Sequence, residues 1–208
     1  MTTTTHIVPV PAGHVVAYRD DGPLSGAMGT MVSGQIPPLP PALAGMFVTG
    51  VLLALGIAGT DGPAVFAPAV ALLLAGPGSS HRHDGRLDWL VPPILRITEY
   101  GFVAMVGFAH GVPPVIIFLL LGAILFHHYD LVYRVRQHVY PPAWLAAAGF
   151  GWEGRMLVVA AGAWFEGVTA VFVLLALYLW GMFGWESVTC WLAAPRSGTE
   201  AANLGIND

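Results

Sequence analysis

Residues 81–89 (HRHDGRLDW) form a charged insert in an otherwise apolar chain. The insert contains two arginines, two aspartates and two histidines, whereas residues 41–76 carry one ionisable side chain, Asp61. Asp84 and Asp88 are four residues apart and would share one face of a helix. Two carboxylates on one face at a membrane boundary can bind a divalent cation, Mg²⁺ or another, through oxygen ligands. The alternative is a solvated loop whose aspartates cap helices and whose arginines fix the topology.

A second polar segment, residues 127–136, would complete such a site if it opens to the same side of the membrane. Carboxylate oxygens for a cation would come from Asp84, Asp88 and Asp130. Guanidinium groups for a phosphate would come from Arg86, Arg134, Arg136 and Arg155. Candidate acid–base residues are His81, His83 and Asp88. This combination predicts a metal-assisted phosphoryl transfer at a membrane boundary.

Histidines support a competing interpretation, an intramembrane transition-metal site. Its candidate ligands would be His81, His83, His110, His127 and His128, with Glu99, Glu153 and Glu166. Their spacing matches no known ligand pattern, and the adjacent His127 and His128 are expected to diverge on a helix. We therefore favour the carboxylate site.

Composition places the chain among multi-pass membrane proteins. Of its 208 residues 56% are hydrophobic and only 10% are charged, and the mean hydropathy is +0.69, whereas soluble domains carry about 25% charged residues. All eight basic residues are arginines, and the net charge of −4 argues against a nucleic-acid partner. The single cysteine, Cys190, excludes an intrachain disulfide.

The apolar segments predict an all-α fold in three parts. Residues 1–40 would form an N-terminal arm with a short interfacial helix over residues 23–36, residues 41–195 a transmembrane domain, and residues 196–208 a loose tail. Apolar helices are expected over residues 41–59, 64–77, 89–109 and 112–133. The last apolar stretch, 155–194, suits either one long helix or a two-helix hairpin.

Ionisable residues within the third apolar segment need a partner or a polar cavity. Arg96 and Glu99 are three residues apart and share a face, so an ion pair between them and a role in a cavity are both open. In either case both side chains should avoid lipid.

Arginine placement predicts the orientation. Arginines occur in alternate connections, near residues 19, 82–86 and 134–155, while the turns at 60–63 and 110–112 have none. By the positive-inside rule the arginine-bearing loops face the cytoplasm of a plasma-membrane protein. Six spans follow if the last stretch is a hairpin, which we favour, and five if it is not.

Two motif regions resemble the CDP-alcohol phosphotransferase superfamily, whose motif is D-x2-D-G-x2-A-R-x8-G-x3-D-x3-D. His81-x2-Asp84-Gly85 matches its start with His in place of the first Asp, and no A-R follows. Alternatively Gly85 and Asp88 match its second half, with Pro92 in place of the last Asp. Tyr133-Arg134-x-Arg136 and the GWEGR stretch ending at Arg155 are similar to the arginines and the start of that family's fifth helix. The resemblance implies a six-helix bundle with a degenerate metal site that holds one cation.

The strings DGRLDWLVPP, FHHYD-x2-YR and GWEGR are similar to an actinobacterial membrane domain of unknown function, over roughly residues 15–195. That domain is often fused to CDP-alcohol phosphotransferase and nucleotidyltransferase domains. The resemblances imply an enzyme that transfers or processes a phosphorylated alcohol or lipid headgroup, with a CDP-linked substrate. The alternative is a non-catalytic membrane partner of an active transferase. Expected partners are membrane lipid and either a second copy of the chain or an active CDP-alcohol phosphotransferase.

Overall fold

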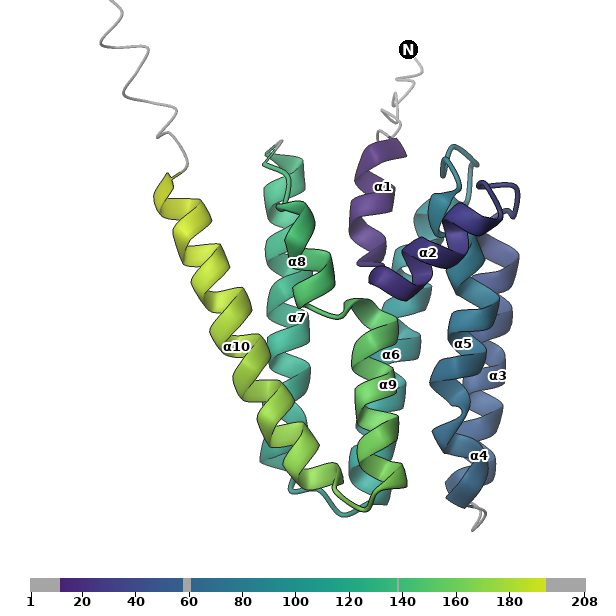
Figure 1. The fold of residues 1–208 in the computed structure, drawn as a ribbon, viewed down its shortest axis with the longest axis vertical. Coiled ribbons are helices and arrows are strands. Elements are labelled where there is room, and N and C mark those ends of the chain that lie inside the picture. Colours follow the sequence, from purple (N-terminus) through teal and green to yellow (C-terminus); the bar gives the residue numbers. More distant parts are fainter. Residues whose placement is uncertain (1–11, 58–60, 138, 194–208) are drawn as a thin grey trace, which may run out of the picture.

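The structure, a computed structural model, describes residues 12–57, 61–137 and 139–193 (Figure 1). Those residues form α-helices joined by short 3-10 helices and loops, and no strand occurs among them. A helix pairs its backbone N–H and C=O groups within one segment, which an apolar surrounding requires. The expected all-α class is confirmed for this part of the chain.

Four helices are long and apolar enough to cross a membrane. They are α3 (Leu39–Ile57), α6 (Val91–Ala109), α7 (Pro114–Arg136) and α10 (Val168–Ala193). The 3-10 helix η2 (Asp88–Leu90) leads directly into α6. Three of the four begin within two residues of the segments predicted from hydropathy, and α10 is the second half of the last predicted stretch. The chain is therefore a membrane protein by length and composition.

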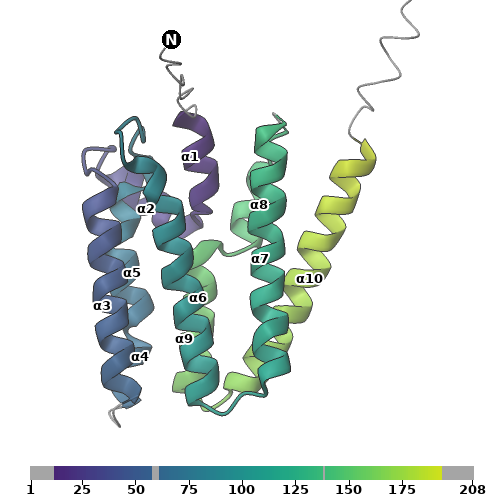
Figure 2. The ribbon, with the colours of Figure 1, turned by 180° about the vertical axis from the view of Figure 1, so that it is seen from behind.

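Two further columns of shorter helices stand beside the long ones (Figures 1 and 2). One consists of α4 (Asp61–Val65), α5 (Ala67–Ala75) and the 3-10 helix η1 (Gly76–Ser80), and it packs against α3. The other is α9 (Gly151–Trp164), which packs against α6. Pro68, near the start of α5, cannot donate a backbone hydrogen bond to α4, which accounts for the break between them.

The last apolar stretch is a hairpin, the alternative favoured from the sequence. Helix α9 ends at Trp164, and α10 starts at Val168 after a turn in which Glu166 has a left-handed backbone, φ 56°. Gly167 N donates to Gly162 O at 2.8 Å and closes this turn. Residues 184–186 (GWE), although partly polar, do not interrupt α10.

The N-terminal arm forms two helices where one was predicted. Helix α1 (Ala12–Arg19) precedes α2 (Pro23–Met31), which is five residues shorter than the interfacial helix predicted from the sequence. Neither helix is detached, because α1 packs against α6 and α7, and α2 packs against η1 and α9. The predictions for residues 1–11 and for the tail after residue 193 lie outside the described residues.

Charged segments gather at one end of the molecule, the upper end in Figure 1. The arm, the 81–89 insert, the end of α7 and α8 (Ala143–Ala148) all lie there. The turns between α6 and α7 and between α9 and α10 lie at the opposite end. The sequence-based expectation that both charged segments share one end agrees with this arrangement.

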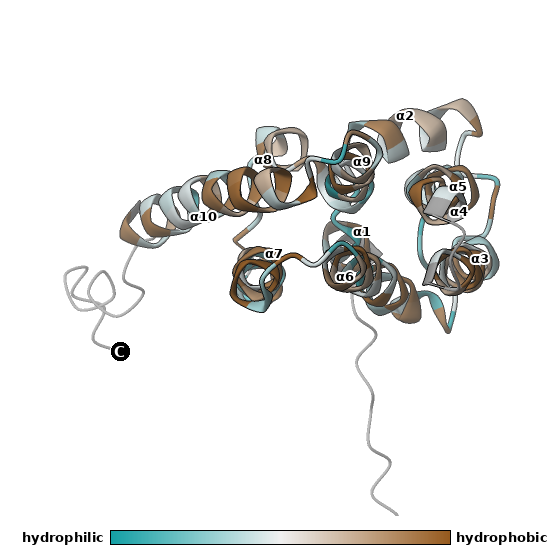
Figure 3. Ribbon diagram, turned by 90° about the horizontal axis from the view of Figure 1, so that it is seen from below, coloured by the Kyte–Doolittle hydropathy of each residue, from teal (hydrophilic) through white to brown (hydrophobic). Residues whose placement is uncertain are grey.

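Helices α6 and α9 stand in the middle of the bundle, with α3 and α5 on one side and α7 and α10 on the other (Figure 3). Buried side chains such as Phe102, Ile117, Trp152 and Phe172 join these layers into one apolar core. Helix α10 leans away from α7 towards the charged end (Figures 1 and 2). The polar groups described next are set into this core near its upper end.

Candidate functional site

Asp20 lies at the centre of a buried polar cluster. It follows the last residue of α1, has a left-handed backbone (φ 55°) and is 8% exposed. Its Oδ1 accepts from His127 Nε2 at 3.1 Å, and its Oδ2 accepts from His128 Nε2 at 3.1 Å and from Arg155 Nη2 at 2.7 Å. Burial alone would raise the pKa of Asp20, but Arg155 and His127 hold the pKa well below its ordinary value of 3.8. Asp20 is therefore an anion that ties the arm to α7 and α9.

Arg155, in the first turns of α9, joins Asp20 to Glu99 of α6. Its Nε donates to Glu99 Oε1 at 2.5 Å, and its Nη1 donates to Gly149 O at 3.0 Å. Arg155 and Glu99 are both fully buried. The pairing of Glu99 with Arg96 that the sequence left open does not occur, because Arg96 donates instead to Tyr18 O in the arm, at 3.2 Å.

The adjacent histidines of α7 act on the same carboxylate. His127 stacks on the ring of Phe183 with centroids 3.9 Å apart, and His128 Nδ1 accepts from the Tyr100 hydroxyl. The sequence analysis expected these adjacent side chains to diverge on the helix. They converge because the two oxygens of Asp20 lie between them.

Asp21 organises a second group of polar side chains beside the first. It accepts from Arg19 Nε at 2.5 Å and from Trp152 Nε1 at 2.9 Å. Arg19 also donates to His83 Nε2 at 3.3 Å, and His83 Nδ1 donates to His81 O. Burial and the Arg19 guanidinium lower the pKa of His83 below its ordinary value of 6.5. His83 is thus a neutral link between the arm and the insert, with both ring nitrogens bonded.

The junction between α1 and α2 lies directly against the junction between α8 and α9. Trp152 N donates to Asp20 O at 3.1 Å, and Glu153 accepts from Gly22 N and Ser25 N at the start of α2, at 3.0 Å each. Gly151 has φ +60°, and a Cβ built on it would lie 2.1 Å from Gly22 N. The two backbone segments approach this closely only because residues 22 and 151 are both glycine.

A cavity of about 360 Å³ opens beside Asp20 and Asp21. Its walls come from α1, α2, η1, α7 and the segment 141–146. Polar lining residues are Asp20, Asp21, Thr30, Ser79, Ser80 and His127. The rest of its lining is apolar, and a ligand there would contact Asp20 and His127 of the buried cluster.

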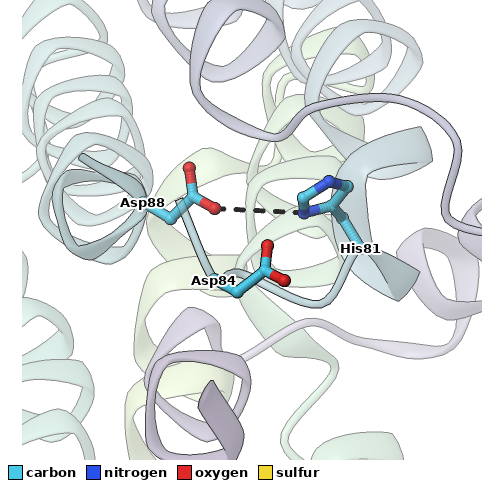
Figure 4. A group of neighbouring side chains, drawn as sticks. All are labelled: His81, Asp84 and Asp88. Atoms are coloured by element: carbon cyan, nitrogen blue, oxygen red, sulfur yellow. Dashed lines mark ion pairs between the residues drawn. The ribbon is translucent and has the colours of Figure 1, made fainter. Parts of the chain in front are cut away.

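The 81–89 insert brings His81, Asp84 and Asp88 together (Figure 4). One ligand atom from each lies within 4.8 Å of the others. The aspartates were expected to meet on a helix face, but residues 81–87 form a loop, which curls so that Asp88 Oδ2 accepts from Gly85 N at 2.9 Å and lies 3.9 Å from His81 Nδ1. Asp84 is exposed and Asp88 is 8% exposed. A nitrogen and two carboxylates at this spacing suit one divalent cation.

The other predicted site residues lie elsewhere. Arg134 is fully buried and pairs with Glu186 and Asp130, each at 2.8 Å. Asp130 also accepts from Ser187 and Trp191 of α10, so it is not a third carboxylate beside Asp84 and Asp88. Arg136 is exposed at the end of α7, and Arg86 is exposed within the insert.

The insert and the arginine-bearing helices do not share the cavity that the sequence suggested. Neither the 360 Å³ cavity nor a second cavity is lined by Asp84, Asp88 or any of the predicted phosphate-binding arginines. The second cavity measures about 440 Å³ and lies at the opposite end, where His110 and Glu166 line it. His110 and Glu166 are thus separated from the other histidines, so the transition-metal cluster is not assembled among the described residues.

The sequence analysis did not identify residues 19–22 of the arm (RDDG) as candidate site residues. We treated this stretch only as part of the polar N-terminal arm, although Arg19 and Asp20 are both almost fully buried. A signal was present, since three consecutive charged residues before a Gly-Pro pair are unusual in a chain with 10% charged residues. Their partners outside the arm are 56 to 135 residues away, and no local pattern indicates them.

Comparison with known proteins identifies the family of this chain, but it does not identify an activity. The model of the Family of unknown function (DUF5941) matches residues 11–204, nearly the whole chain. The chain belongs to this family. No curated protein matches it, and no solved structure matches it.

Proposed function

We propose that this membrane protein binds a phosphorylated alcohol or a lipid headgroup at its charged end, through one divalent cation, and processes it there. The observation that carries the proposal is the convergence of His81, Asp84 and Asp88 in the 81–89 insert. Mg²⁺ or Mn²⁺ bound there would neutralise phosphate oxygens and polarise the phosphoryl group. The distant resemblance to the CDP-alcohol phosphotransferases supports the same reaction class.

Arginines within the insert supply the phosphate contacts in this proposal. Arg82 and Arg86 are exposed, alternate in sequence with the three cation ligands, and form no ion pair among the described residues. Guanidinium groups bind phosphate oxygens in pairs of parallel hydrogen bonds. Arg134 and Arg155 are less suited to this role, because both are fully buried and protein carboxylates take most of their donors. His83 positions the insert, since Arg19 and His81 occupy its ring nitrogens.

The second candidate is a non-catalytic membrane partner of an active transferase. The buried pairs of Arg134 with Glu186 and of Arg155 with Glu99 favour it, because they stabilise the bundle and engage both Nη atoms of Arg134 and the Nε of Arg155. Such a protein would keep the bundle and lose the metal chemistry.

We further propose six spans with the charged end in the cytoplasm. Four helices meet the length and hydropathy of a span, and the α4–α5–η1 column and the shorter α9 lie beside them. The N-terminal arm, which carries Arg19, and the 81–89 insert, which carries Arg82 and Arg86, lie at the charged end, as the positive-inside rule requires of a cytoplasmic face.

Titration with Mn²⁺ tests the cation site. We expect the purified chain in lipid nanodiscs to bind one Mn²⁺, followed by the electron paramagnetic resonance signal of the free ion. Asp84→Asn should weaken binding about tenfold or more, since loss even of outer-shell partners costs metal sites about 10–100-fold. Thermal stability without metal should not change, because no hydrogen bond or ion pair holds Asp84 in the described structure.

Glu166→Gln is the matched control, since Glu166 is an exposed carboxylate at the opposite end. It should bind Mn²⁺ like the wild type. Glycerol phosphate should tighten Mn²⁺ binding in the wild type and not in the double variant Arg82→Gln with Arg86→Gln, because coupling between two ligands is reciprocal. If Asp84→Asn binds Mn²⁺ as well as the wild type, the cation site is wrong and the non-catalytic partner is the better account.

A further inference from the structure

Arg96 is a charged residue of α6 that has no counter-ion among the described residues. It lies in the second turn of α6, a helix long and apolar enough to span a membrane. The buried arginines Arg19, Arg134 and Arg155 each pair with at least one carboxylate. Within the described part of the chain, Arg96 forms only a hydrogen bond to a backbone oxygen, that of Tyr18. A positive charge in a membrane span is costly unless an anion or a polar cavity meets it.

Most of the hydrogen-bonding capacity of Arg96 is unused. Its Nη2 donates to Tyr18 O at 3.2 Å, whereas its Nε is enclosed and has no partner among the described residues. Its Nη1 forms no hydrogen bond with them either, and the residue is partly exposed. A guanidinium group has five N–H donors in a planar fork that matches a phosphate. An anion that approaches from outside the chain would supply the missing partner.

The surface around Arg96 is apolar and aromatic. Pro93, Arg96 and Tyr100 follow each other at intervals of three and four residues, so they share one face of α6. Pro93 is exposed, and Ile97 beside it is 61% exposed. Trp89, in η2 at the start of the span, is 58% exposed, and tryptophan is enriched at membrane boundaries. An anion that meets Arg96 here therefore also meets apolar surface, as the phosphate of a lipid does.

Helix geometry directs the Arg96 side chain towards the membrane boundary. Side chains of a helix tilt towards its N-terminus, and α6 begins at the charged end, directly after the 81–89 insert (Figure 1). The Cα atom of Arg96 lies about 10 Å deeper than that of Trp89, from the rise of a helix. Long arginine side chains extend over such distances to place their charge at the headgroups. The guanidinium thus avoids the acyl chains, as the sequence predicted, and reaches towards the lipid phosphates.

We propose that Arg96 binds the phosphate of an anionic phospholipid from the leaflet at the charged end, while an acyl chain lies against Ile97. A guanidinium and a phosphate diester form charge-assisted hydrogen bonds. A lipid with a net negative charge supplies the missing counter-charge, whereas a zwitterionic lipid brings its own cation. The site goes beyond the proposed function, because His81, Asp84 and Asp88 take no part in it.

Native mass spectrometry of the full chain in detergent micelles with phosphatidylglycerol tests the site. We expect Arg96→Gln to bind this lipid about tenfold more weakly than the wild type, or worse, as for lost hydrogen bonds to a charged group. Glutamine keeps an N–H donor for Tyr18 O. Arg136→Gln is the matched control, because it removes one charge from an exposed position at the end of α7. It should bind as the wild type does, and phosphatidylcholine should bind the wild type more weakly than phosphatidylglycerol does.

Pro93→Glu tests the same site with Arg96 in place. Pro93 lies in the first turn of α6, three residues before Arg96, so a glutamate there can pair with Arg96 and suits the positive end of the helix. This internal counter-ion should displace the lipid, whereas Pro93→Gln, which adds no charge, should keep it. Because the position is exposed, both variants should unfold within a few degrees of the wild type.

Wild-type retention of phosphatidylglycerol by Arg96→Gln or by Pro93→Glu would overturn the proposal. An equal loss in Arg136→Gln would also overturn it, since the attraction would then depend on net charge alone. Equal binding of phosphatidylcholine would show that Arg96 needs no counter-charge from the lipid. A chelator should leave lipid binding unchanged, and if it releases the lipid, the lipid is held at the cation site and not at Arg96.

Discussion

Replacing Arg155 with methionine is expected to lower the free energy of unfolding by about 3–5 kcal/mol, the cost of removing one partner from a buried ion pair. Methionine fills a similar volume, so packing changes little. The loss arises because Asp20 and Glu99, both buried, then lack their shared guanidinium. A denaturant titration in mixed micelles measures it.

Arg136→Met is the matched control, because Arg136 is exposed at the end of α7. It should change stability by less than about 0.5 kcal/mol, as expected for a surface substitution. Removing the two charges left behind should restore part of the loss, so Arg155→Met combined with Asp20→Asn and Glu99→Gln should be more stable than Arg155→Met alone. Equal stabilities of Arg155→Met and Arg136→Met would show that the buried cluster does not hold the arm.

Gly151→Ala is expected to produce the second large effect. Gly151 has φ +60°, a conformation that costs an L-residue about 1–2 kcal/mol. A Cβ there would lie 2.1 Å from Gly22 N, and overpacking of this kind adds about 1–3 kcal/mol. The backbone of one junction must move, and the arm should separate from the start of α9.

Gly111→Ala distinguishes the two contributions. Gly111 has φ +68°, but a Cβ built on it meets no atom within 4 Å, so only the conformational cost applies. Unfolding titrations of both variants should show the larger loss for Gly151→Ala. Limited proteolysis should also cut the arm faster in that variant. If the two alanine variants lose the same stability, the close contact between the junctions is not present in the protein.

Hydropathy predicted the helices well, because a span must be apolar over its whole length. The segment predicted at 41–59 is α3, and the segment predicted at 112–133 is α7. The break between α4 and α5 depends on Pro68 and was not predicted. The hairpin depends on the left-handed turn at Glu166 and was predicted only as one of two alternatives.

The sequence alone could not predict which buried charged side chains pair with one another. Glu99 has a near neighbour of opposite charge, Arg96, yet its partner is Arg155, 56 residues away on a helix that packs against α6. Asp20 lies in a stretch that resembles an interfacial arm, and its burial follows only from the position of α1 against α7. Such contacts depend on the packing of helices, for which one sequence gives no local signal.

The insert was singled out for its composition, and the geometry adds His81 to the ligands expected for the cation. Pulsed electron paramagnetic resonance of the Mn²⁺-loaded protein tests this most directly, because a bound imidazole nitrogen modulates the electron spin echo. We predict nitrogen modulation in the wild type, its loss in His81→Ala and its retention in His110→Ala. A Mn²⁺-loaded protein with no nitrogen modulation, or one whose modulation survives His81→Ala, would contradict the cation site at the insert.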